Sequence, residues 1–333
     1  MLAASQKARV GETALTVSKV GLGGAPLGNL YQAVPGRQAV ATVERAVDVG
    51  FTHIDTAPLY GFGLSEERIG QALKGRSRDE YTISTKVGRL IVPAGGAPST
   101  AEVYWAAPRH FEAVFDFSST GIKKSIASSK RRLGIEDIDM LLIHDCDEHV
   151  EEALGESYPV LGRMRERGEV KAVGAGLNSY ETALKLAKSA HFDCFLLAGR
   201  YTLLEQGALN EFLPFCHDNK IGVIIGGPFN SGILASDKIS PGARYDYSTA
   251  SKDVLTKARR IEKICLRHHV PLRAAALQFV LANPVVTCVI PGCRSPREVE
   301  SNARALNVRI PRPVWDELKE EGLVADDAPT PNG

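Results

Sequence analysis

Hydrophobic and polar positions follow two different periods along this chain. Short runs of β-branched and aliphatic residues, which are typical of buried strands, alternate with longer segments that have apolar residues at helical spacing. The runs that we predict to be strands are 17–22, 52–56, 81–86, 138–143, 170–174, 194–198, 222–225 and 287–290. The segments that we predict to be helices are 37–49, 66–73, 118–133, 151–167, 180–189, 206–219, 251–268 and 297–306.

This alternation predicts the fold class. Strands that alternate with helices pair in parallel through right-handed crossovers. Eight such units within 333 residues favour an α/β fold of the closed (β/α)8 type, a TIM barrel, with residues 1–333 forming one domain. An open doubly wound sheet is the alternative. The segment after the first predicted strand, Gly21-Leu-Gly-Gly-Ala-Pro26, lacks the glycine spacing of a Rossmann nucleotide site and has a proline where a helix would begin.

Three segments are longer than a simple barrel requires. They are residues 88–117, residues 228–249 and the tail after residue 308. The first two follow the third and seventh predicted strands, and in a barrel the loops that follow strands build the active site. We therefore expect a barrel with extended rim loops that cover the substrate and a cofactor.

Composition and charge exclude several kinds of partner. The net charge is +1, and the basic residues are interspersed with acidic ones, so the chain has no basic stripe suited to nucleic acid or a membrane surface. No apolar run has membrane-spanning length, and the first ten residues lack the apolar core of a signal peptide. The six cysteines include no C-x-x-C pair, which fits reduced thiols. We expect a cytoplasmic protein with a small-molecule substrate; its oligomeric state is not set by these features.

Four ionisable residues stand at or just after the ends of predicted strands. Asp55 ends the second strand, and Tyr60 follows on a loop because Pro58 interrupts regular structure. Lys86 ends the third strand, and His144 follows the fourth. The phenol of tyrosine has a pKa of about 10, so a tyrosine that exchanges protons at neutral pH needs a nearby ammonium, which a carboxylate would hold in place.

Together these four residues suit hydride transfer to or from a carbonyl, because charge on the oxygen must be neutralised as the hydride moves. His144 would donate a hydrogen bond to the substrate oxygen or relay the proton. The run His144-Asp-Cys-Asp-Glu-His149 contains metal-binding residue types, but adjacent ligands rarely converge on one ion, and structural zinc prefers spaced pairs. We therefore expect no metal.

The same residues resemble the aldo-keto reductase superfamily. The resemblance rests on the Asp-Thr-Ala-x-x-Tyr-Gly run at 55–61, on Lys86 and on His144, and it extends from Leu15 to Asn302. It implies a nicotinamide-dependent oxidoreductase on a (β/α)8 barrel. Tyr60 would be the general acid/base, Asp55 and Lys86 would tune it, and His144 would orient the substrate.

Residues 23–31 and 197–204 are similar to the sugar 1-dehydrogenase branch of that superfamily, which also includes an enzyme that oxidises pyridoxal. The resemblance implies that the anomeric hydroxyl of an aldose, of the L-fucose or D-threo-aldose type, is oxidised to the lactone with Tyr60 as the general base. The alternatives are pyridoxal oxidation, NADPH-dependent reduction of an aldehyde or ketone, and a regulatory subunit that senses the cofactor without turnover.

Residues 225–234 resemble the loop that covers the cofactor pyrophosphate, where small residues allow backbone N–H groups to approach phosphate. Residues 290–302 resemble the adenosine end, where Ser295-Pro296 would begin a helix. The resemblance implies NAD, because Glu298 stands where NADP-preferring relatives often have arginine; NADP is the alternative, through Arg294 and Arg297. The implied cofactor contacts are Gly24, Asn178, Arg200, Phe229, Ser231, Gly232, Gly292, Arg294, Glu298 and Asn302.

The chain also departs from the family pattern around the nicotinamide. Ala198 stands where the family usually has glutamine, and Gly226 replaces the aromatic residue that stacks on the ring. After the fifth strand, Asn178 is the one residue suited to contact the carboxamide of the nicotinamide. We expect Arg200 or Tyr201 to fill this part of the pocket.

Overall fold

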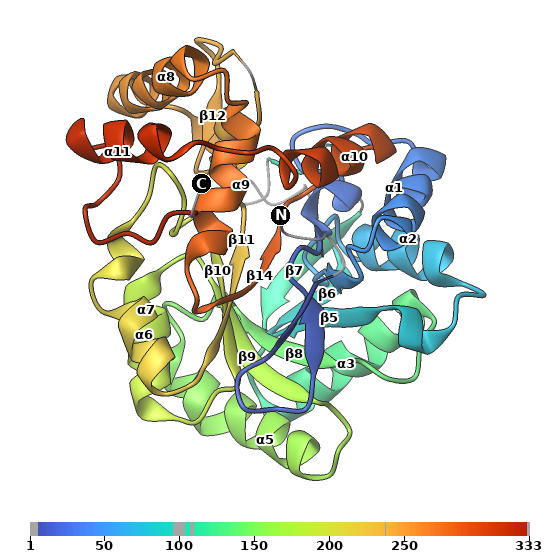
Figure 1. Cartoon of the computed structure of the whole chain (residues 1–333). Coiled ribbons are helices and arrows are strands. Elements are labelled where there is room, and N and C mark those ends of the chain that lie inside the picture. The colour runs from blue at the N-terminus through green and yellow to red at the C-terminus, as the bar shows by residue number, and fades with distance from the viewer. Residues whose placement is uncertain (1–5, 96–103, 107–109, 237, 332–333) are drawn as a thin grey trace.

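The computed structural model describes residues 6–95, 104–106, 110–236 and 238–331. Its centre is an eight-stranded parallel sheet that is nearly closed into a barrel (Figure 1). Single bridges from Val20 to Val289 and from Gly23 to Gly292 join the first and last strands. The predicted (β/α)8 barrel is confirmed. In sheet order its strands are β3 (Leu22–Gly23), β4 (His53–Asp55), β5 (Thr82–Val87), β8 (Met140–His144), β9 (Ala172–Leu177), β10 (Cys194–Ala198), β11 (Gly222–Gly226) and β14 (Val286–Ile290).

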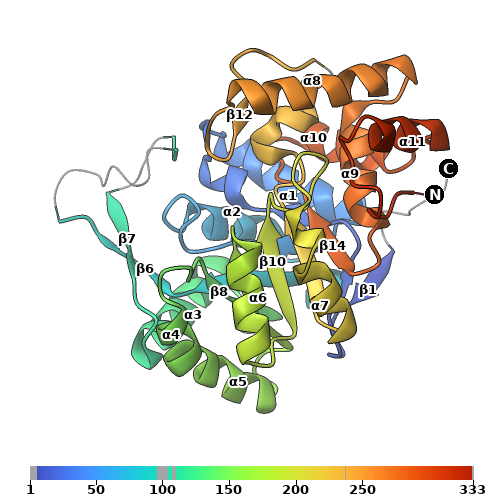
Figure 2. The same cartoon turned by 90° about the vertical axis from the view of Figure 1, so that its left-hand side faces the viewer.

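Helices surround the barrel on its outside, as Figures 1 and 2 show. Several begin where the sequence offers a serine: the side chains of Ser118, Ser179 and Ser295 each accept a hydrogen bond from a backbone N–H of the first turn. The helices that follow the barrel strands are α1 (Gly36–Asp48), α2 (Leu64–Leu73), α3 (Ser119–Leu133), α4 (Val150–Glu152) with α5 (Tyr158–Glu166), α6 (Tyr180–Ser189), α7 (Phe212–Asp218), α9 (Leu272–Ala282) and α10 (Pro296–Ala305).

The core has two parts, because side chains of a strand point alternately to its two faces. One cluster fills the barrel interior and includes Met140, Leu142, Leu196 and Ile224. A much larger cluster lies between the outer face of the barrel and the surrounding helices. A filled interior leaves the end of the barrel as the place for a ligand.

Two helices and part of one strand differ from the prediction. No helix was predicted at α9, which is buried on nearly every side, so its residues lack the amphipathic period that marks a surface helix. No helix was predicted at α11 (Arg312–Glu320) either. The predicted helix 251–268 is present as α8 (Lys252–Arg267), which packs against α9 and α11. The predicted strand 17–22 is divided: β2 (Thr16–Ser18) pairs with β1 (Lys7–Arg9) in a hairpin, and only its end joins the barrel.

Both long rim segments contain hairpins. Strands β6 (Arg89–Pro93) and β7 (Phe111–Phe115) pair antiparallel and extend away from the barrel (Figure 2). Strands β12 (Arg244–Tyr245) and β13 (Ser248–Thr249) form a shorter hairpin after β11. The two hairpins follow the third and seventh barrel strands, as the lengths of these segments suggested.

All six cysteines are buried and none forms a disulfide. Burial raises the pKa of the Cys146, Cys216 and Cys265 thiols to about 12. It raises the pKa of Cys293 to about 12 as well. None of the helices in the described part of the chain is long and apolar enough to span a bilayer.

Candidate active site

The four residues predicted to carry the chemistry lie together at one end of the barrel. Asp55 is the last residue of β4, Lys86 is near the end of β5, and His144 is the last residue of β8. Tyr60 lies on the loop between β4 and α2. The carboxyl ends of parallel strands share one rim of a barrel, which explains why residues far apart in the sequence converge here.

Lys86 connects the other groups through its ammonium. Its Nζ donates to Asp55 Oδ1 at 2.6 Å, to the carbonyl of Thr56 at 2.9 Å and to the Tyr60 hydroxyl at 3.0 Å. The side chains of Lys86 and Asp55 are 1% and 2% exposed, so this ion pair is almost fully removed from water. A buried ion pair with additional hydrogen bonds holds its members in one geometry.

The backbone behind Tyr60 requires glycine. Gly61 has a φ of +63°, and a Cβ atom there would lie 2.4 Å from the carbonyl oxygen of Gly28. No side chain fits this approach, and the positive φ would strain any other residue. Gly61 therefore fixes the turn that directs Tyr60 toward Lys86.

The Tyr60 phenol keeps its proton at neutral pH in this arrangement. Burial, with the carboxylates of Asp55 and Asp145, raises the pKa of Tyr60 well above its ordinary value, and this outweighs the opposite effect of Arg89. The imidazole of His144 lies near, its ring centroid 6.0 Å from that of Tyr60. Burial and the charges of Lys86 and Arg89 lower the pKa of His144 well below its usual range, so this imidazole is neutral.

Asp145 supports His144, a role that was not predicted from the sequence. Its Oδ2 lies 3.4 Å from His144 Nε2 and accepts a hydrogen bond from Arg89 at 3.0 Å. Its Oδ1 accepts from Asn178 Nδ2 at 3.1 Å. The chain reaches this geometry with a φ of +44° at Asp145. No sequence motif marks a positive φ at an aspartate, so this position of Asp145 could not be predicted from the sequence.

A second group of supporting residues lies behind Asp55. The Ser84 hydroxyl donates to Asp55 Oδ2 at 2.7 Å, and the same hydroxyl is 3.4 Å from His53 Nε2. His53 Nδ1 is 3.0 Å from the Thr82 hydroxyl. None of these residues was predicted to be functional, because a serine or histidine inside a strand is most often an ordinary core residue.

We expect His53 to make stability depend on pH. Burial lowers its pKa to about 4, whereas an unfolded histidine has a pKa of about 6.5. The folded state therefore binds this proton less readily, and stability falls as the pH drops below 6.5. The expected loss is about 2 kcal/mol between pH 7 and pH 5.

Chemical denaturation of the wild type and of His53→Asn at both pH values measures this effect. The asparagine variant should be less stable at pH 7 but should lose less stability on acidification. An equal pH dependence in both proteins would show that another group titrates.

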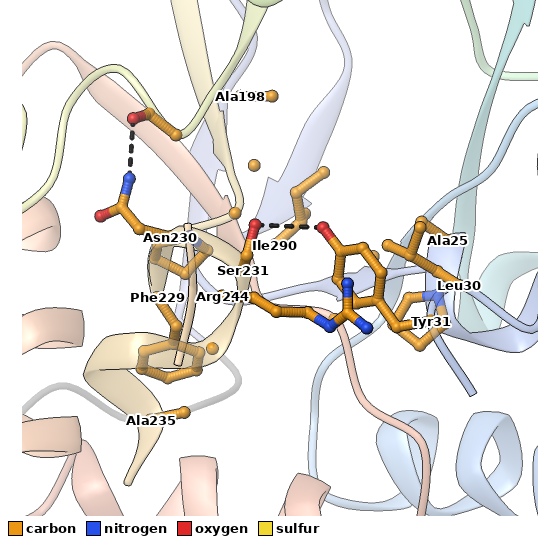
Figure 3. A pocket seen from close by; sticks show the side chains of 18 of the residues that line it. Ala25, Leu30, Tyr31, Ala198, Phe229, Asn230, Ser231, Ala235, Arg244 and Ile290 are labelled. Atoms are coloured by element: carbon orange, nitrogen blue, oxygen red, sulfur yellow. Dashed lines mark hydrogen bonds between the residues drawn. The ribbon is translucent and has the colours of Figure 1, made fainter. Parts of the chain in front are cut away.

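A cavity of about 600 Å³ opens at the same end of the barrel. Asp55 and Tyr60 line it, so the cavity reaches the acid/base residues. Figure 3 shows part of its wall, where side chains from the β3 loop, β10, β14 and the segment after β11 face one space. The predicted cofactor residues that line it are Gly24, Asn178, Arg200, Phe229, Ser231, Gly232, Gly292, Arg294 and Glu298.

The tenth predicted cofactor residue, Asn302, does not line the cavity. It is fully buried in α10, and its Oδ1 accepts a hydrogen bond from Arg273 at 2.7 Å. Arg273 itself lines the cavity. Asn302 can therefore act on a ligand only through the position of Arg273.

The loop after β11 turns sharply at the cavity wall. Ser231 and Gly232 have successive positive φ angles of 57° and 99°, and the Gly232 N–H donates to the Phe229 carbonyl at 3.0 Å. The Ser231 hydroxyl and the Tyr31 hydroxyl are 3.0 Å apart, and Figure 3 shows the two side chains pointing toward each other. The guanidinium of Arg244 lies 4.8 Å from the centre of the Tyr31 ring.

Glu298, which also lines the cavity, is bonded to Arg294. The carboxylate accepts from the Arg294 backbone N–H at 2.8 Å and from its guanidinium at 2.9 Å. Ser295 caps α10 as predicted. The negative charge of Glu298 is thus partly balanced before a ligand arrives.

Arg200 is the better of the two predicted residues for the nicotinamide side. It lines the cavity beside Ala198 and Gly226, donates to the Asn178 carbonyl at 2.8 Å and forms a two-bond ion pair with Asp246. Tyr201 does not line the cavity: it is buried in the core, where its hydroxyl bonds to Asn283. Tyr201 therefore does not fill this part of the pocket, contrary to that alternative of the prediction; its ring packs on Phe279 instead.

The cavity wall suits an anionic ligand with flat rings. Four arginines (Arg200, Arg244, Arg273 and Arg294) line it, and so do aromatic and small residues. These are the features that a nicotinamide dinucleotide requires. Within the described ranges, no group of three or more His, Cys, Asp or Glu side chains is placed to hold a metal ion.

Comparison with known proteins gives consistent matches over almost the whole chain. The sequence model of the aldo/keto reductase family matches residues 19–321. A D-threo-aldose 1-dehydrogenase from a Pseudomonas species is 38% identical over 95% of this chain and 96% of its own length. A pyridoxal 4-dehydrogenase from Microbacterium luteolum is 36% identical over 97% of this chain and 99% of its own.

Solved structures share the fold. An aldo-keto reductase from Bacillus halodurans, in its holo form, superposes with a TM-score of 0.77 at 21% identity, covering 95% of this chain and 96% of that one. A glycerol dehydrogenase from Gluconobacter oxydans gives a TM-score of 0.74 at 24% identity, covering 99% of this chain and 98% of that one. At these identities the likeness is one of fold.

Proposed function

The chain belongs to the aldo/keto reductase family, and from this premise we propose that it is an NAD(P)-dependent dehydrogenase of aldoses. The proposed reaction oxidises the anomeric hydroxyl of an L-fucose or D-threo-aldose type sugar to the lactone. The observation that carries the proposal is the contact of the Tyr60 hydroxyl with the buried Lys86–Asp55 pair at the wall of a cavity that suits a dinucleotide.

The proposed cofactor would be held along the 600 Å³ cavity. The loop with Ser231 and Gly232 would receive the pyrophosphate, Arg294 and Glu298 would contact the adenosine end, and Asn178 with Arg200 would border the nicotinamide. When bound, the cofactor accepts hydride from the substrate or returns it.

The protein's own part in this reaction is to handle the proton. In the oxidative direction Tyr60 would take the proton of the anomeric hydroxyl, and Lys86 would stabilise the phenolate that this requires. Neutral His144 has one N–H, which would point to Asp145 Oδ2 and keep the ring in place. Its Nδ1 would then accept a hydrogen bond from a substrate hydroxyl and so orient the substrate. In the reductive direction the same phenol would donate its proton.

An aldose is the substrate class that we propose first, because the relative with 38% identity is named for aldose oxidation. Pyridoxal is the second candidate, because a relative of similar identity is named for its oxidation. Two aromatic side chains of the cavity wall suit either: Tyr31 and Tyr247 line the cavity, with their ring centroids 6.3 Å apart. Flat apolar ring faces pack against the C–H face of a sugar or a pyridine ring.

Initial rates with L-fucose, D-arabinose and pyridoxal, each with NAD and with NADP, test the proposal. We expect turnover of at least one aldose in the oxidative direction. Turnover of pyridoxal and of neither aldose would make pyridoxal, and not an aldose, the substrate. Reduction of aldehydes without any oxidation would make the protein a reductase, and tight cofactor binding without turnover would make it a sensor.

NAD is the cofactor that we propose, because the Glu298 carboxylate lines the cavity at the position where the family resemblance implies the adenosine end. We expect Glu298→Gln to raise the ratio of kcat/KM with NADP to kcat/KM with NAD by about tenfold, since it removes a charge that repels a 2′-phosphate and releases the Arg294 guanidinium. Glu300→Gln is the matched control, because Glu300 is on the same helix but outside the cavity. Equal ratios in all three proteins would contradict the role of Glu298.

A cytoplasmic location is also part of the proposal. It is supported by the six cysteines, none of which forms a disulfide. Fractionation of the source cells with an antibody to the protein tests it.

A further inference from the structure

The hairpin β12–β13 turns through two residues with an unfavourable backbone conformation. Asp246 and Tyr247 join the two strands, and their φ angles are +46° and +63°. Two-residue turns with two positive φ angles favour sequences such as Asn-Gly, and a bulky side chain at positive φ is unusual. Such residues cluster at binding and catalytic sites, where the surrounding structure holds them in place.

Two contacts hold this turn against the rim of the barrel. The Nη2 of Arg200 donates to both carboxylate oxygens of Asp246, at 3.0 and 2.9 Å. The backbone N–H of Tyr247 donates to the Ser231 hydroxyl at 3.3 Å. The loops after β10 and β11 therefore fix the position of Tyr247.

The ring of Tyr247 faces the proposed active site. Tyr247 lines the 600 Å³ cavity together with Tyr60, and its ring centroid is 6.3 Å from that of Tyr31 and 5.5 Å from that of Tyr104. Burial raises the pKa of Tyr247 well above its ordinary value, and the nearby Tyr60 and Asp145 raise it further, so the hydroxyl lies on the side of the acid/base residues. Tyr247 is nevertheless 44% exposed. Both observations are explained by a ring whose open surface faces the cavity.

The phenols that line this cavity differ in their hydrogen bonds. Tyr60 is bonded to Lys86, and Tyr31 is bonded to Ser231. The Tyr247 hydroxyl forms no hydrogen bond with another residue in the described part of the chain. A phenol both donates and accepts hydrogen bonds, as a sugar hydroxyl does. The Tyr247 hydroxyl is therefore available to a hydroxyl group of a ligand.

Tyr60 and Tyr247 reach the cavity from different parts of the rim. Tyr60 belongs to the loop after β4, and Tyr247 belongs to the hairpin after β11. Strands β4 and β11 are not neighbours in the barrel. A ligand that is bonded to both phenols must therefore offer hydroxyl groups at two separate positions, as an aldose does.

We propose that Tyr247 is a specificity-determining residue of the proposed reaction. While Tyr60 takes the proton of the anomeric hydroxyl, the Tyr247 hydroxyl binds a second hydroxyl of the same sugar, and the Tyr247 ring packs on its C–H face. This inference rests on the proposed function, because it requires an aldose as the substrate. It adds that the enzyme selects its sugar by a hydroxyl that does not react.

Tyr247→Phe tests the contact, because it keeps the ring and removes only the hydroxyl. With an aldose that the wild type oxidises, kcat/KM should fall by about three- to tenfold, and the change should lie in KM because the lost hydrogen bond is remote from the reacting atoms. Tyr31→Phe is the matched control, since its hydroxyl is already bonded to Ser231. At saturating NAD, the control should keep its KM for the sugar within about twofold. Equal KM values in the wild type and in Tyr247→Phe would overturn the inference.

Monodeoxy forms of the same sugar identify the second hydroxyl. With the form that lacks it, kcat/KM of the wild type should fall by about three- to tenfold, and kcat/KM of Tyr247→Phe should fall no further. A purely structural effect of the substitution would lower kcat/KM by the same factor for every form of the sugar, and that result would overturn the inference.

Tyr247→Gly tests why the turn holds a tyrosine. Glycine adopts a positive φ without strain, so the thermal unfolding midpoint should not fall below that of the wild type. The value of kcat/KM for the sugar should fall at least as far as in Tyr247→Phe, because the ring is lost as well. A lower midpoint with unchanged kcat/KM would show that Tyr247 serves the fold and not the substrate.

Wild-type rates separate this inference from the proposed function. If the wild type oxidises an aldose and Tyr247→Phe has the same kinetics with every form of the sugar, the inference about Tyr247 is wrong and the proposed function stands. If the wild type oxidises no aldose, the proposed function is wrong, and the role of Tyr247 as a reader of a sugar hydroxyl is wrong with it.

Discussion

Tyr60→Phe is expected to lower kcat for oxidation by about 10²- to 10⁴-fold, because the ring remains but the group that accepts the proton is removed. The hydroxyl is 3.0 Å from Lys86 Nζ, and among the described residues Tyr60 is the one tyrosine hydrogen-bonded to that ammonium. NAD affinity should stay within about twofold, since the ring keeps its packing beside Trp105. Steady-state rates and a fluorescence titration with NAD measure the two quantities.

The pH profile tests the same assignment in the unmodified protein. Because burial and Asp55 raise the pKa of Tyr60, the reactive phenolate is a minor species at neutral pH. We expect kcat/KM for oxidation to rise with pH by up to about tenfold per pH unit, whereas kcat/KM for reduction stays level over the same range.

Tyr31→Phe serves as the control for both measurements. Its hydroxyl is bonded to Ser231, not to Lys86. The Tyr31→Phe variant should therefore have a changed Kd for NAD, but its kcat/KM for oxidation should rise with pH as steeply as that of the wild type. A Tyr60→Phe variant with near-normal turnover, or a wild-type oxidation rate that does not change with pH, would refute the role of Tyr60.

Lys86→Met is expected to reduce both stability and rate. The substitution removes the ammonium but leaves the Asp55 carboxylate, which is 2% exposed, without its ion-pair partner. Removing one member of a buried ion pair costs about 3–5 kcal/mol of unfolding free energy. The rate should fall by about 10²-fold or more, because without the ammonium the pKa of Tyr60 rises further.

The double variant Asp55→Asn with Lys86→Met separates the two effects. It removes both charges, so we expect it to recover much of the stability lost in Lys86→Met while turnover stays low. Urea denaturation and initial rates measure them independently. Recovery of turnover together with stability would mean that the pair serves the fold and not the reaction.

The regular alternation of strands and helices along the chain made the barrel predictable. Each strand such as β8 or β10 is a short apolar run, and each is followed by a helix with a clear apolar face. Helix α9 could not be predicted in this way, because a helix that is buried between β14, α8 and α10 needs apolar residues on nearly every side. Its sequence then carries no period.

Of the proposed active site, only the four acid/base residues themselves could be predicted, not the residues that hold them in place. Asp55, Tyr60, Lys86 and His144 stand next to strand ends, and their residue types are those that proton transfer needs. Asp145, Ser84 and Arg89 act through these residues, and their roles depend on distances that the order of residues does not encode. The same holds for Asn302, which faces Arg273 where the resemblance implied a ligand.

The burial of the cysteines has a practical consequence. Alkylating reagents attack the thiolate, so thiols whose pKa is raised to about 12 react very slowly while the protein is folded. The six sites are distributed from the loop after β8 to the segment after β14, including α7 and α8. Each alkylation therefore requires its own region to open, and mass spectrometry of alkylated peptides would record, without any engineered label, the order in which that half of the barrel unfolds.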